Sequence, residues 1–289
     1  MKSYTLKWDG FSLELGKKTC VMGILNTTPD SFSDGGRFFD LDDALAQGEK
    51  LVEAGADILD IGGESTRPFS KGVSAQEETR RVIPVIEKLA PRIPVPISID
   101  TCKATVAQRA VAAGAAMIND VSALQLDPEM ATVAAASRVP VILMHMLGSP
   151  RTMQVSPVYD DLVGEIRSFL EAAINNAVDK GIERGLLIAD PGIGFGKTID
   201  HNLFLIKHLA ALDALEVPLL IGPSRKAFIR TLLKGDSDRE ITPDMPEVET
   251  GTQAAVTAAI LNGAHIVRVH NVARTRTTVK IIDALKRTH

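Results

Sequence analysis

The chain has 289 residues, of which 45% are hydrophobic and 24% are charged, and its formal net charge at pH 7 is -4. These values are typical of a soluble globular protein with one or two domains and a sizeable core. The sequence has no Lys/Arg cluster of the kind that contacts a phosphate backbone, so we expect no nucleic-acid partner. An anionic substrate would have to be bound by a few local cations.

The two cysteines, Cys20 and Cys102, are far apart, and no Cys/His spacing typical of zinc accompanies them. We therefore expect two reduced thiols in a cytosolic protein. The N-terminus lacks the apolar region of a signal peptide, and no apolar run approaches the ~18 residues of a membrane span. By elimination, we predict a cytoplasmic protein without a membrane partner.

The first predicted element is a β-hairpin within residues 1–20. Residues 4–8 and 11–15 alternate between apolar and polar side chains, and the dipeptide between them, Asp9-Gly10, favours a tight turn. Placed before a barrel, such a hairpin is expected to cover the bottom and to contribute stability rather than catalysis.

About eight short apolar runs follow the hairpin, and each ends at a polar or turn-forming residue. The runs and the residues that follow them are 21–25 with Asn26, 58–61 with Gly62, 95–99 with Asp100, 117–118 with Asn119, 139–144 with His145, 186–189 with Asp190, 217–221 with Gly222, and 266–269 with His270. Functional residues at the carboxyl ends of successive strands predict an α/β fold, a TIM (β/α)8 barrel whose strands point to one site. With no linker or low-complexity segment, residues 1–289 are predicted to form one domain.

Helical patterns lie between the predicted strands. Gly55, Gly114 and Gly263 are expected to end three of these helices. Residues 74–77 match a capping box, and residues 159–180 form the longest apolar stripe. Segments 27–40, 65–74 and 146–159 are longer than a turn requires and are predicted to be mobile loops over the site, whereas 235–249 is predicted to be a plain surface loop.

Three strand ends carry side chains that can read a flat heterocycle, namely Asp100, Asn119 and Asp190. A carboxylate accepts hydrogen bonds and an amide both donates and accepts, which matches an amino group beside ring nitrogens. One such residue commonly only caps the next helix, but three in one barrel favour ligand binding.

Cationic groups are predicted at two further strand ends. Arg268 and His270 alternate along one strand and can bind a pyrophosphate together. Lys226 lies near the start of a helix, where Ser224 and the helix N-terminus can receive a carboxylate. A P-loop at Gly194-Phe195-Gly196-Lys197-Thr198 is excluded because position 191, where its first glycine would fall, is proline.

Two longer motifs resemble the signatures of the dihydropteroate synthases. The segment Asn26-Thr27-Thr28-Pro29-Asp30-Ser31-Phe32-Ser33-Asp34-Gly35-Gly36 resembles the first signature, and Gly62-Gly63-Glu64-Ser65-Thr66-Arg67-Pro68 resembles the second. The likeness continues through Asp100, Asn119-Asp120, Asp190-Pro191-Gly192, Ser224-Arg225-Lys226 and Arg268-Val269-His270.

The resemblance implies a transferase of folate biosynthesis that condenses 6-hydroxymethyl-7,8-dihydropterin diphosphate with p-aminobenzoate to 7,8-dihydropteroate and diphosphate. It also implies a Mg²⁺ cofactor, sulfonamides as p-aminobenzoate mimics, and a homodimer. Two alternatives remain open. One is a pterin-dependent methyltransferase on the same barrel, and the other is a non-catalytic pterin-binding paralogue.

The same resemblance assigns residues to each substrate. The pterin ring is assigned to Asp100, Asn119, Asp190, Lys226 and Arg268. The diphosphate is assigned to Asn26, Thr66, Arg268 and His270, with Asn26 as the Mg²⁺ ligand. The p-aminobenzoate pocket is assigned to Phe32, Thr66, Arg67, Pro68, Phe195 and Ser224. The catalytic set is Asp100, Lys226, Arg268 and His270.

No nucleophilic residue is required by this chemistry. We expect the C–O bond to diphosphate to break first, because an electron-rich dihydropterin delocalises the methylene cation while bound cations stabilise the departing anion. The arylamine then attacks.

Overall fold

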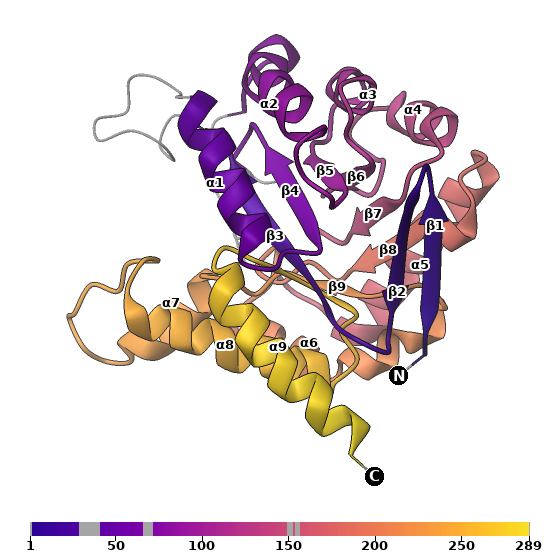
Figure 1. The fold of residues 1–289 in the computed structure, drawn as a ribbon. Helices are drawn as coiled ribbons and strands as arrows, with labels where there is room; N and C mark the ends of the chain where they lie inside the picture. The colour runs from indigo at the N-terminus through magenta and orange to yellow at the C-terminus, as the bar shows by residue number, and fades with distance from the viewer. Residues whose placement is uncertain (1, 29–40, 66–71, 149–152, 154–156, 289) are drawn as a thin grey trace.

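The computed structural model describes residues 2–28, 41–65, 72–148, 153 and 157–288. Parallel strands form the centre of the molecule in the order β8-β7-β6-β5-β4-β3-β10-β9 (Figure 1). The strands are β3 (Cys20–Asn26), β4 (Ile58–Gly62), β5 (Ile97–Asp100), β6 (Met117–Asp120), β7 (Val141–Met144), β8 (Leu187–Asp190), β9 (Leu220–Ile221) and β10 (Ile266–Val269). A parallel bridge between Ala189 and Leu219 joins the two ends of the sheet. The predicted TIM barrel is therefore confirmed.

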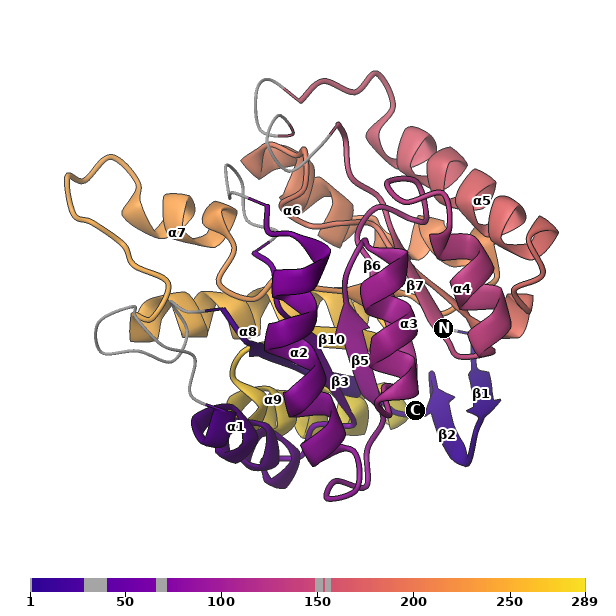
Figure 2. The same ribbon diagram turned by 90° about the horizontal axis from the view of Figure 1, so that it is seen from above.

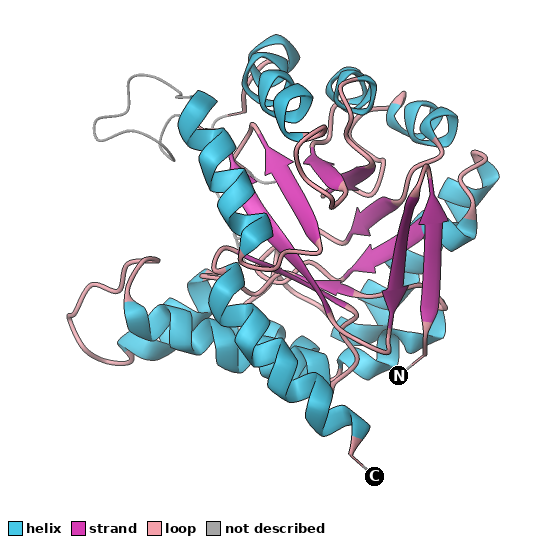
Figure 3. Cartoon of the chain, viewed as in Figure 1, coloured by secondary structure: helices cyan, strands magenta, loops and turns pink. Residues whose placement is uncertain are grey.

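Helices surround the strands, as Figure 3 shows in cyan around magenta. They are α1 (Leu41–Glu53), α2 (Ala75–Leu89), α3 (Ala104–Ala112), α4 (Met130–Ser137), α5 (Leu162–Asp179), α6 (Ile199–Lys207), α7 (Ala227–Lys234), α8 (Pro246–Leu261) and α9 (Val272–Arg287), with 3-10 turns η2 (Arg184–Leu186) and η3 (Leu209–Leu215). The view from above in Figure 2 shows α2, α3 and α4 side by side along one flank. None of the helices in the described part of the chain has the length and apolar character that crossing a bilayer requires.

Each barrel strand is apolar because both of its faces are covered, one by barrel side chains and the other by helices. Every residue of β4 through β8 is buried. The chain returns from helix to strand through glycines in left-handed conformations, with φ of +99° at Gly55, +112° at Gly114 and +111° at Gly263. The predicted helix ends at these glycines are confirmed.

Three local predictions need correction. The longest helix begins at Leu162 rather than at residue 159, because Asp161 caps it by accepting from the Gly164 N–H. Ser74 caps α2, but the Glu77 carboxylate binds Arg80 and Arg81, so only half of the predicted capping box forms. The segment predicted as a loop over 235–249 ends earlier, since α8 begins with a proline at residue 246, a position that suits its fixed φ.

The N-terminal hairpin consists of β1 (Tyr4–Trp8) and β2 (Phe11–Leu15). Asp9 and Gly10 both have positive φ, 36° and 80°, as the predicted tight turn requires. The Trp8 indole N–H donates to the Ala116 carbonyl at 2.6 Å, and Ala116 directly precedes β6. The Tyr4 ring lies edge-on to the His265 ring, which precedes β10.

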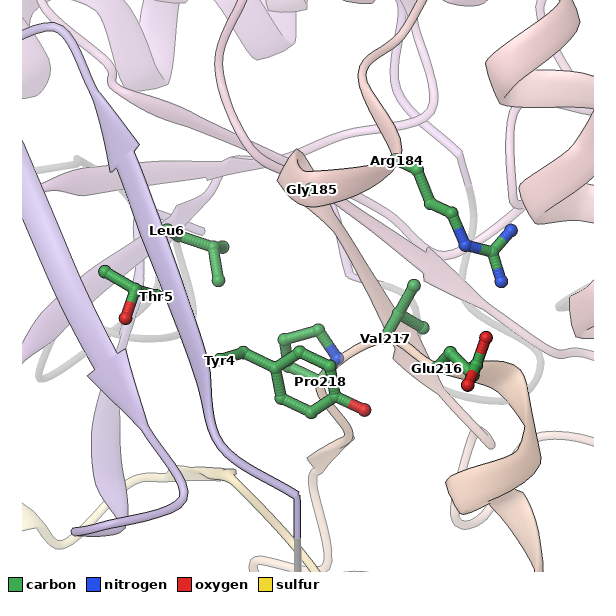
Figure 4. Close-up of a pocket in the computed structure, with 8 residues that line it drawn as sticks. All are labelled: Tyr4, Thr5, Leu6, Arg184, Gly185, Glu216, Val217 and Pro218. Atoms are coloured by element: carbon green, nitrogen blue, oxygen red, sulfur yellow. The ribbon is translucent and has the colours of Figure 1, made fainter.

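The hairpin therefore lies at the amino ends of the strands, which is the barrel bottom. A groove of about 210 Å³ remains between Tyr4, Arg184, Glu216 and Pro218 (Figure 4). The predicted position at the bottom is confirmed, and because the catalytic groups of such barrels lie at the opposite end, we expect the hairpin to contribute stability.

Replacing Trp8 tests this attachment. Trp8→Phe leaves the Ala116 carbonyl without its donor, so we expect the unfolding free energy to fall by about 1–3 kcal/mol. Lys7→Ala, on the exposed side of the same strand, is the control and should change it by less than about 0.5 kcal/mol. Urea unfolding measures both, and equal effects of the two variants would contradict a bonded hairpin.

Candidate active site

The carboxyl ends of β4, β5, β6 and β10 bring four polar side chains together inside the barrel. The Arg268 guanidinium donates from Nε to Asp60 Oδ2 at 2.6 Å and from Nη2 to Asp100 Oδ2 at 2.7 Å. The Asn119 amide donates to the same Asp60 oxygen at 3.2 Å. Since β3 lies between β10 and β4, and β5 lies beyond β4, Arg268 reaches past one strand to Asp60 and past two strands to Asp100.

This network has more acceptors than its members use. Among the described residues, no group donates a hydrogen bond to Asp60 Oδ1 or Asp100 Oδ1, although both atoms are buried. Buried polar atoms normally have partners, and acceptor oxygens left without one call for a ligand that donates. Two acceptors beside a cation match the amino and ring N–H groups of a flat heterocycle.

The charges of this network depend strongly on burial. Burial raises the pKa of Asp100 to about 7, although the Arg268 cation opposes the shift. Burial also disfavours the Arg268 cation, but the carboxylates of Asp60 and Asp100 outweigh it and raise the pKa of the guanidinium above its usual range. Arg268 therefore stays charged, and Asp100 is a carboxylate whose protonation a bound ligand can change.

Asp190 lies at the end of β8 and contributes a third carboxylate. Its Oδ1 accepts from the Gly192 N–H at 2.7 Å. Gly192 has a φ of +72°, and a Cβ there would lie 1.9 Å from the His145 carbonyl oxygen, so only glycine fits. Burial raises the pKa of Asp190 to about 6, while the charges of Lys226, Arg268 and Lys197 act in the opposite direction.

The segment after β9 carries Ser224 and Lys226 on a tight turn. Arg225 between them has a φ of +58°, and its N–H donates to the Thr252 hydroxyl at 3.1 Å. The Lys226 ammonium lies 4.0 Å from the centre of the Phe195 ring, which is the geometry of a cation–π contact. This pair links the strand ends of β8 and β9.

Ser224 is also bonded to His270, which follows β10. Its Oγ lies 2.9 Å from His270 Nδ1 and accepts from the His270 backbone N–H at 3.2 Å. When Nδ1 carries a proton and donates to this oxygen, the serine hydroxyl proton remains able to meet an anion. The arrangement therefore orients the imidazole and presents a donor beside it.

Asn26 ends β3, with Gly62 of β4 as its neighbour in register. Its side-chain amide makes no hydrogen bond to any described residue, so its oxygen is available for a ligand. Within the described ranges, no group of three or more His, Cys, Asp or Glu residues could bind a metal. The donor set therefore fits a cation that takes one protein oxygen and otherwise keeps waters and substrate oxygens, as Mg²⁺ does.

Four predicted pocket residues, Phe32, Thr66, Arg67 and Pro68, lie outside the described residues. Glu64, just before the last three, binds Lys103, and its Oε1 accepts from the Val73 N–H at 3.1 Å. Lys103 also donates to the buried Glu78 at 2.6 Å. These ion pairs attach the described residues on both sides of 66–71 to α2 and to the start of α3.

Sequence reasoning missed Asp60, Lys197 and a role for His145. Asp60 is fully buried within β4, and the signal was a carboxylate inside an otherwise apolar strand, which is costly unless it is paired. Lys197 was considered only within the rejected P-loop, yet it is 3% exposed. Its Nζ lies 3.0 Å from His145 Nδ1, whereas most lysines are exposed at the surface.

Comparison with known proteins agrees with this geometry. Residues 22–270 match the family model described as pterin binding enzyme. The dihydropteroate synthase of Synechocystis sp. is 48% identical over 272 residues, which cover 94% of this chain and 92% of the relative.

Two solved structures are similar over the whole barrel. Xanthomonas albilineans dihydropteroate synthase with 4-aminobenzoic acid is 45% identical, with a TM-score of 0.90 and 100% coverage of both chains. The Yersinia pestis dihydropteroate synthase with a sulfonamide drug complex is 45% identical, with a TM-score of 0.90 and 98% coverage of both chains. The chain therefore belongs to the dihydropteroate synthases of the pterin-binding enzyme family.

Proposed function

We propose that this chain condenses 6-hydroxymethyl-7,8-dihydropterin diphosphate with p-aminobenzoate, and that the groups at the carboxyl ends of the strands carry the reaction. The observation that supports this most directly is that Asp60 Oδ1 and Asp100 Oδ1, beside Arg268, have no donor among the described residues. A pterin supplies the donors that these oxygens lack. The family membership supports the same substrate class.

The pterin ring would be bound by Asp100, Asn119, Asp190, Lys226 and Arg268. The carboxylates accept from the amino group and ring N–H groups, and Lys226 donates to the ring carbonyl or a ring nitrogen. Arg268 lies against the ring while remaining bonded to Asp60 and Asp100. Asp60 thus acts as a positioning residue, because it fixes both Arg268 and Asn119.

The diphosphate would be bound at the rim by Asn26, Arg268 and His270, with Thr66 contributing from outside the described residues. A Mg²⁺ ion held by the Asn26 side-chain oxygen would neutralise charge on the diphosphate. The contact between Ser224 Oγ and His270 Nδ1 would orient the imidazole, leaving Nε2 to face the departing anion. Arg268 and His270 are thus placed to stabilise negative charge as it develops.

The p-aminobenzoate subsite would lie against Phe195 and Lys226, with Phe32, Thr66, Arg67 and Pro68 completing it. The Phe195 ring supplies an apolar wall, and Lys226 above it supplies a cation. The carboxylate would be received by the Ser224 hydroxyl and the first turn of α7. An aryl sulfonamide has a similar shape and would compete for this subsite.

The reaction needs positioning and electrostatics rather than a nucleophile. The C–O bond to diphosphate breaks, the bonding electrons leave with diphosphate, and the dihydropterin carries the methylene cation. The Asp100 carboxylate stabilises that developing positive charge, because it is buried and its charge is poorly screened. The p-aminobenzoate nitrogen then forms the new C–N bond and loses a proton.

A homodimer is proposed from the surface of α6, α7 and α8, which lie together in Figure 1. A groove of about 460 Å³ there is lined by Leu203, Phe228, Leu232, Gly251 and Ala255, among others. Leu203, Phe204, Leu232, Leu233 and Leu261 are exposed. An exposed apolar patch of this kind marks an interface, and the small residues of α8 allow a second copy to approach closely.

The activity itself is tested with purified protein, pterin diphosphate and Mg²⁺, with and without p-aminobenzoate. We expect 7,8-dihydropteroate only when all three are present, because the new C–N bond requires the arylamine and the departing diphosphate requires its cation. Product mass and released diphosphate measure this, and a sulfonamide should compete with p-aminobenzoate. Pterin binding without condensation would favour the non-catalytic paralogue, and methyl transfer to a corrinoid protein would favour the methyltransferase.

Asp100→Asn tests the electrostatic role. The amide keeps the shape of the side chain but removes the charge, so kcat should fall by about 100-fold or more. Because Asp100 acts as the carboxylate and burial raises its pKa to about 7, wild-type activity should decline as the pH falls through this range. Asp179→Asn, on an exposed residue at the end of α5, is the control, and equal kcat values would remove Asp100 from the mechanism.

Leu232→Glu tests the dimer. A charge within the apolar groove should dissociate the protein from twice the chain mass of 31.0 kDa to a monomer. Sedimentation velocity measures the mass. Leu285→Glu, at a leucine of α9 that is 59% exposed against 51% for Leu232, should leave the dimer intact, and a monomeric wild type would overturn the proposal.

A further inference from the structure

The loop between β8 and α6 carries Phe195 and is rich in glycine. Gly192, Gly194 and Gly196 all adopt positive φ, 72°, 80° and 65°. Glycines lose more conformational freedom on folding than other residues, so this loop is ordered only if other groups restrain it. The position of the Phe195 ring therefore depends on what bonds to the loop backbone.

Besides Asp190, which accepts from the Gly192 N–H, three side chains restrain this backbone. Asn202 accepts from the Gly194 N–H at 2.7 Å, and the Tyr159 hydroxyl donates to the Gly196 carbonyl at 2.8 Å. The Lys197 ammonium donates to the Phe195 carbonyl at 3.0 Å. Only the last of these bonds is made to the residue whose ring faces Lys226.

Lys197 is an unusual choice for such a restraint. Its side chain is 3% exposed, and burying an ammonium group is costly unless it is bonded and charge-compensated. Burial lowers the pKa of Lys197 to about 7, while the nearby Asp190 carboxylate opposes the shift. A residue that is always neutral would be less costly to bury, so a lysine at this position points to a role beyond packing.

His145 provides the second partner of Lys197. Burial, together with the Lys197 charge, lowers the pKa of His145 to about 3, so the imidazole is neutral. A neutral imidazole can accept at Nδ1, which lies 3.0 Å from Lys197 Nζ. The His145 ring is itself fixed edge-on against Phe169 of α5, with ring centres 4.8 Å apart. Lys197 thus connects the Phe195 backbone to a rigid part of the barrel wall.

We propose that Lys197 is a positioning residue for p-aminobenzoate: it fixes the Phe195 carbonyl to His145 and thereby holds the Phe195 ring in place as a wall of the p-aminobenzoate subsite. Lys197 does not touch substrate. This inference rests on the placement of p-aminobenzoate against Phe195 under the proposed function. It adds a requirement that the sequence motifs do not contain.

Steady-state kinetics with each substrate varied test the proposal. In Lys197→Met the carbonyl loses its donor, so the KM for p-aminobenzoate should rise by about tenfold, the size expected for one charge-assisted hydrogen bond. The KM for the pterin diphosphate should change by less than about threefold, because Asp60, Asp100 and Asn119 remain in place. The inhibition constant of a sulfonamide should rise in parallel with the KM for p-aminobenzoate.

Two comparison variants separate positioning from general stability. Lys197→Gln keeps an N–H donor that can reach the Phe195 carbonyl, so it should recover part of the loss, and it serves for the whole test if Lys197→Met does not fold. Lys180→Met, at an exposed lysine after α5, should match the wild type. A lower melting temperature in both Lys197 variants with both KM values unchanged would overturn the inference.

Phe195→Leu distinguishes this inference from the proposed function. If Phe195→Leu raises the KM for p-aminobenzoate but the Lys197 variants do not, Lys197 is structural only and the inference is wrong. If Phe195→Leu also has no effect, p-aminobenzoate does not bind against this ring, and the placement in the proposed function is itself wrong.

Discussion

The bridge from Arg268 to Asp60 and Asp100 is the interaction on which the site depends. It lies inside the barrel, where burying an unpaired charge is strongly destabilising, so each charged group depends on its partner of opposite charge. Because its members come from β10, β4 and β5, the bridge forms only when the barrel closes. Within the described part of the chain, it also leaves one buried oxygen of each carboxylate without a donor, and a ligand with N–H groups could supply the missing hydrogen bonds.

The two ends of the barrel divide stability from chemistry. At the amino ends of the strands, the hairpin covers the core and Trp8 satisfies a buried carbonyl. At the carboxyl ends, glycine-rich turns bring backbone close to charged groups, and side chains such as Lys197 and Tyr159 restrain them. Glycine allows the backbone of a loop to approach a ligand closely, because it has no side chain. Glycine also leaves the loop flexible, so hydrogen bonds from neighbouring side chains are needed to hold its conformation.

Cationic groups are also concentrated at the carboxyl ends of the strands. The chain as a whole is acidic, with a net charge of -4, yet Arg268, Lys226 and Lys197 converge around Asp190. Desolvation strengthens every interaction among these groups, because the medium between them screens poorly. Cations are therefore concentrated around one buried carboxylate although the chain as a whole is acidic.

The sequence by itself determined the barrel, its strand ends and the polar residues that follow the strands. Each strand is short, apolar and followed by a polar residue, so Asp100, Asn119, Asp190 and Arg268 could be assigned to one edge before their contacts were known. Tertiary structure alone decided what they bond to. The sequence does not show what Asp60 within β4 and Lys197 after β8 bind. Their partners, Arg268 of β10 and His145, come close only in the folded barrel, because the pairing of buried polar groups depends on distance in space and not on spacing along the chain.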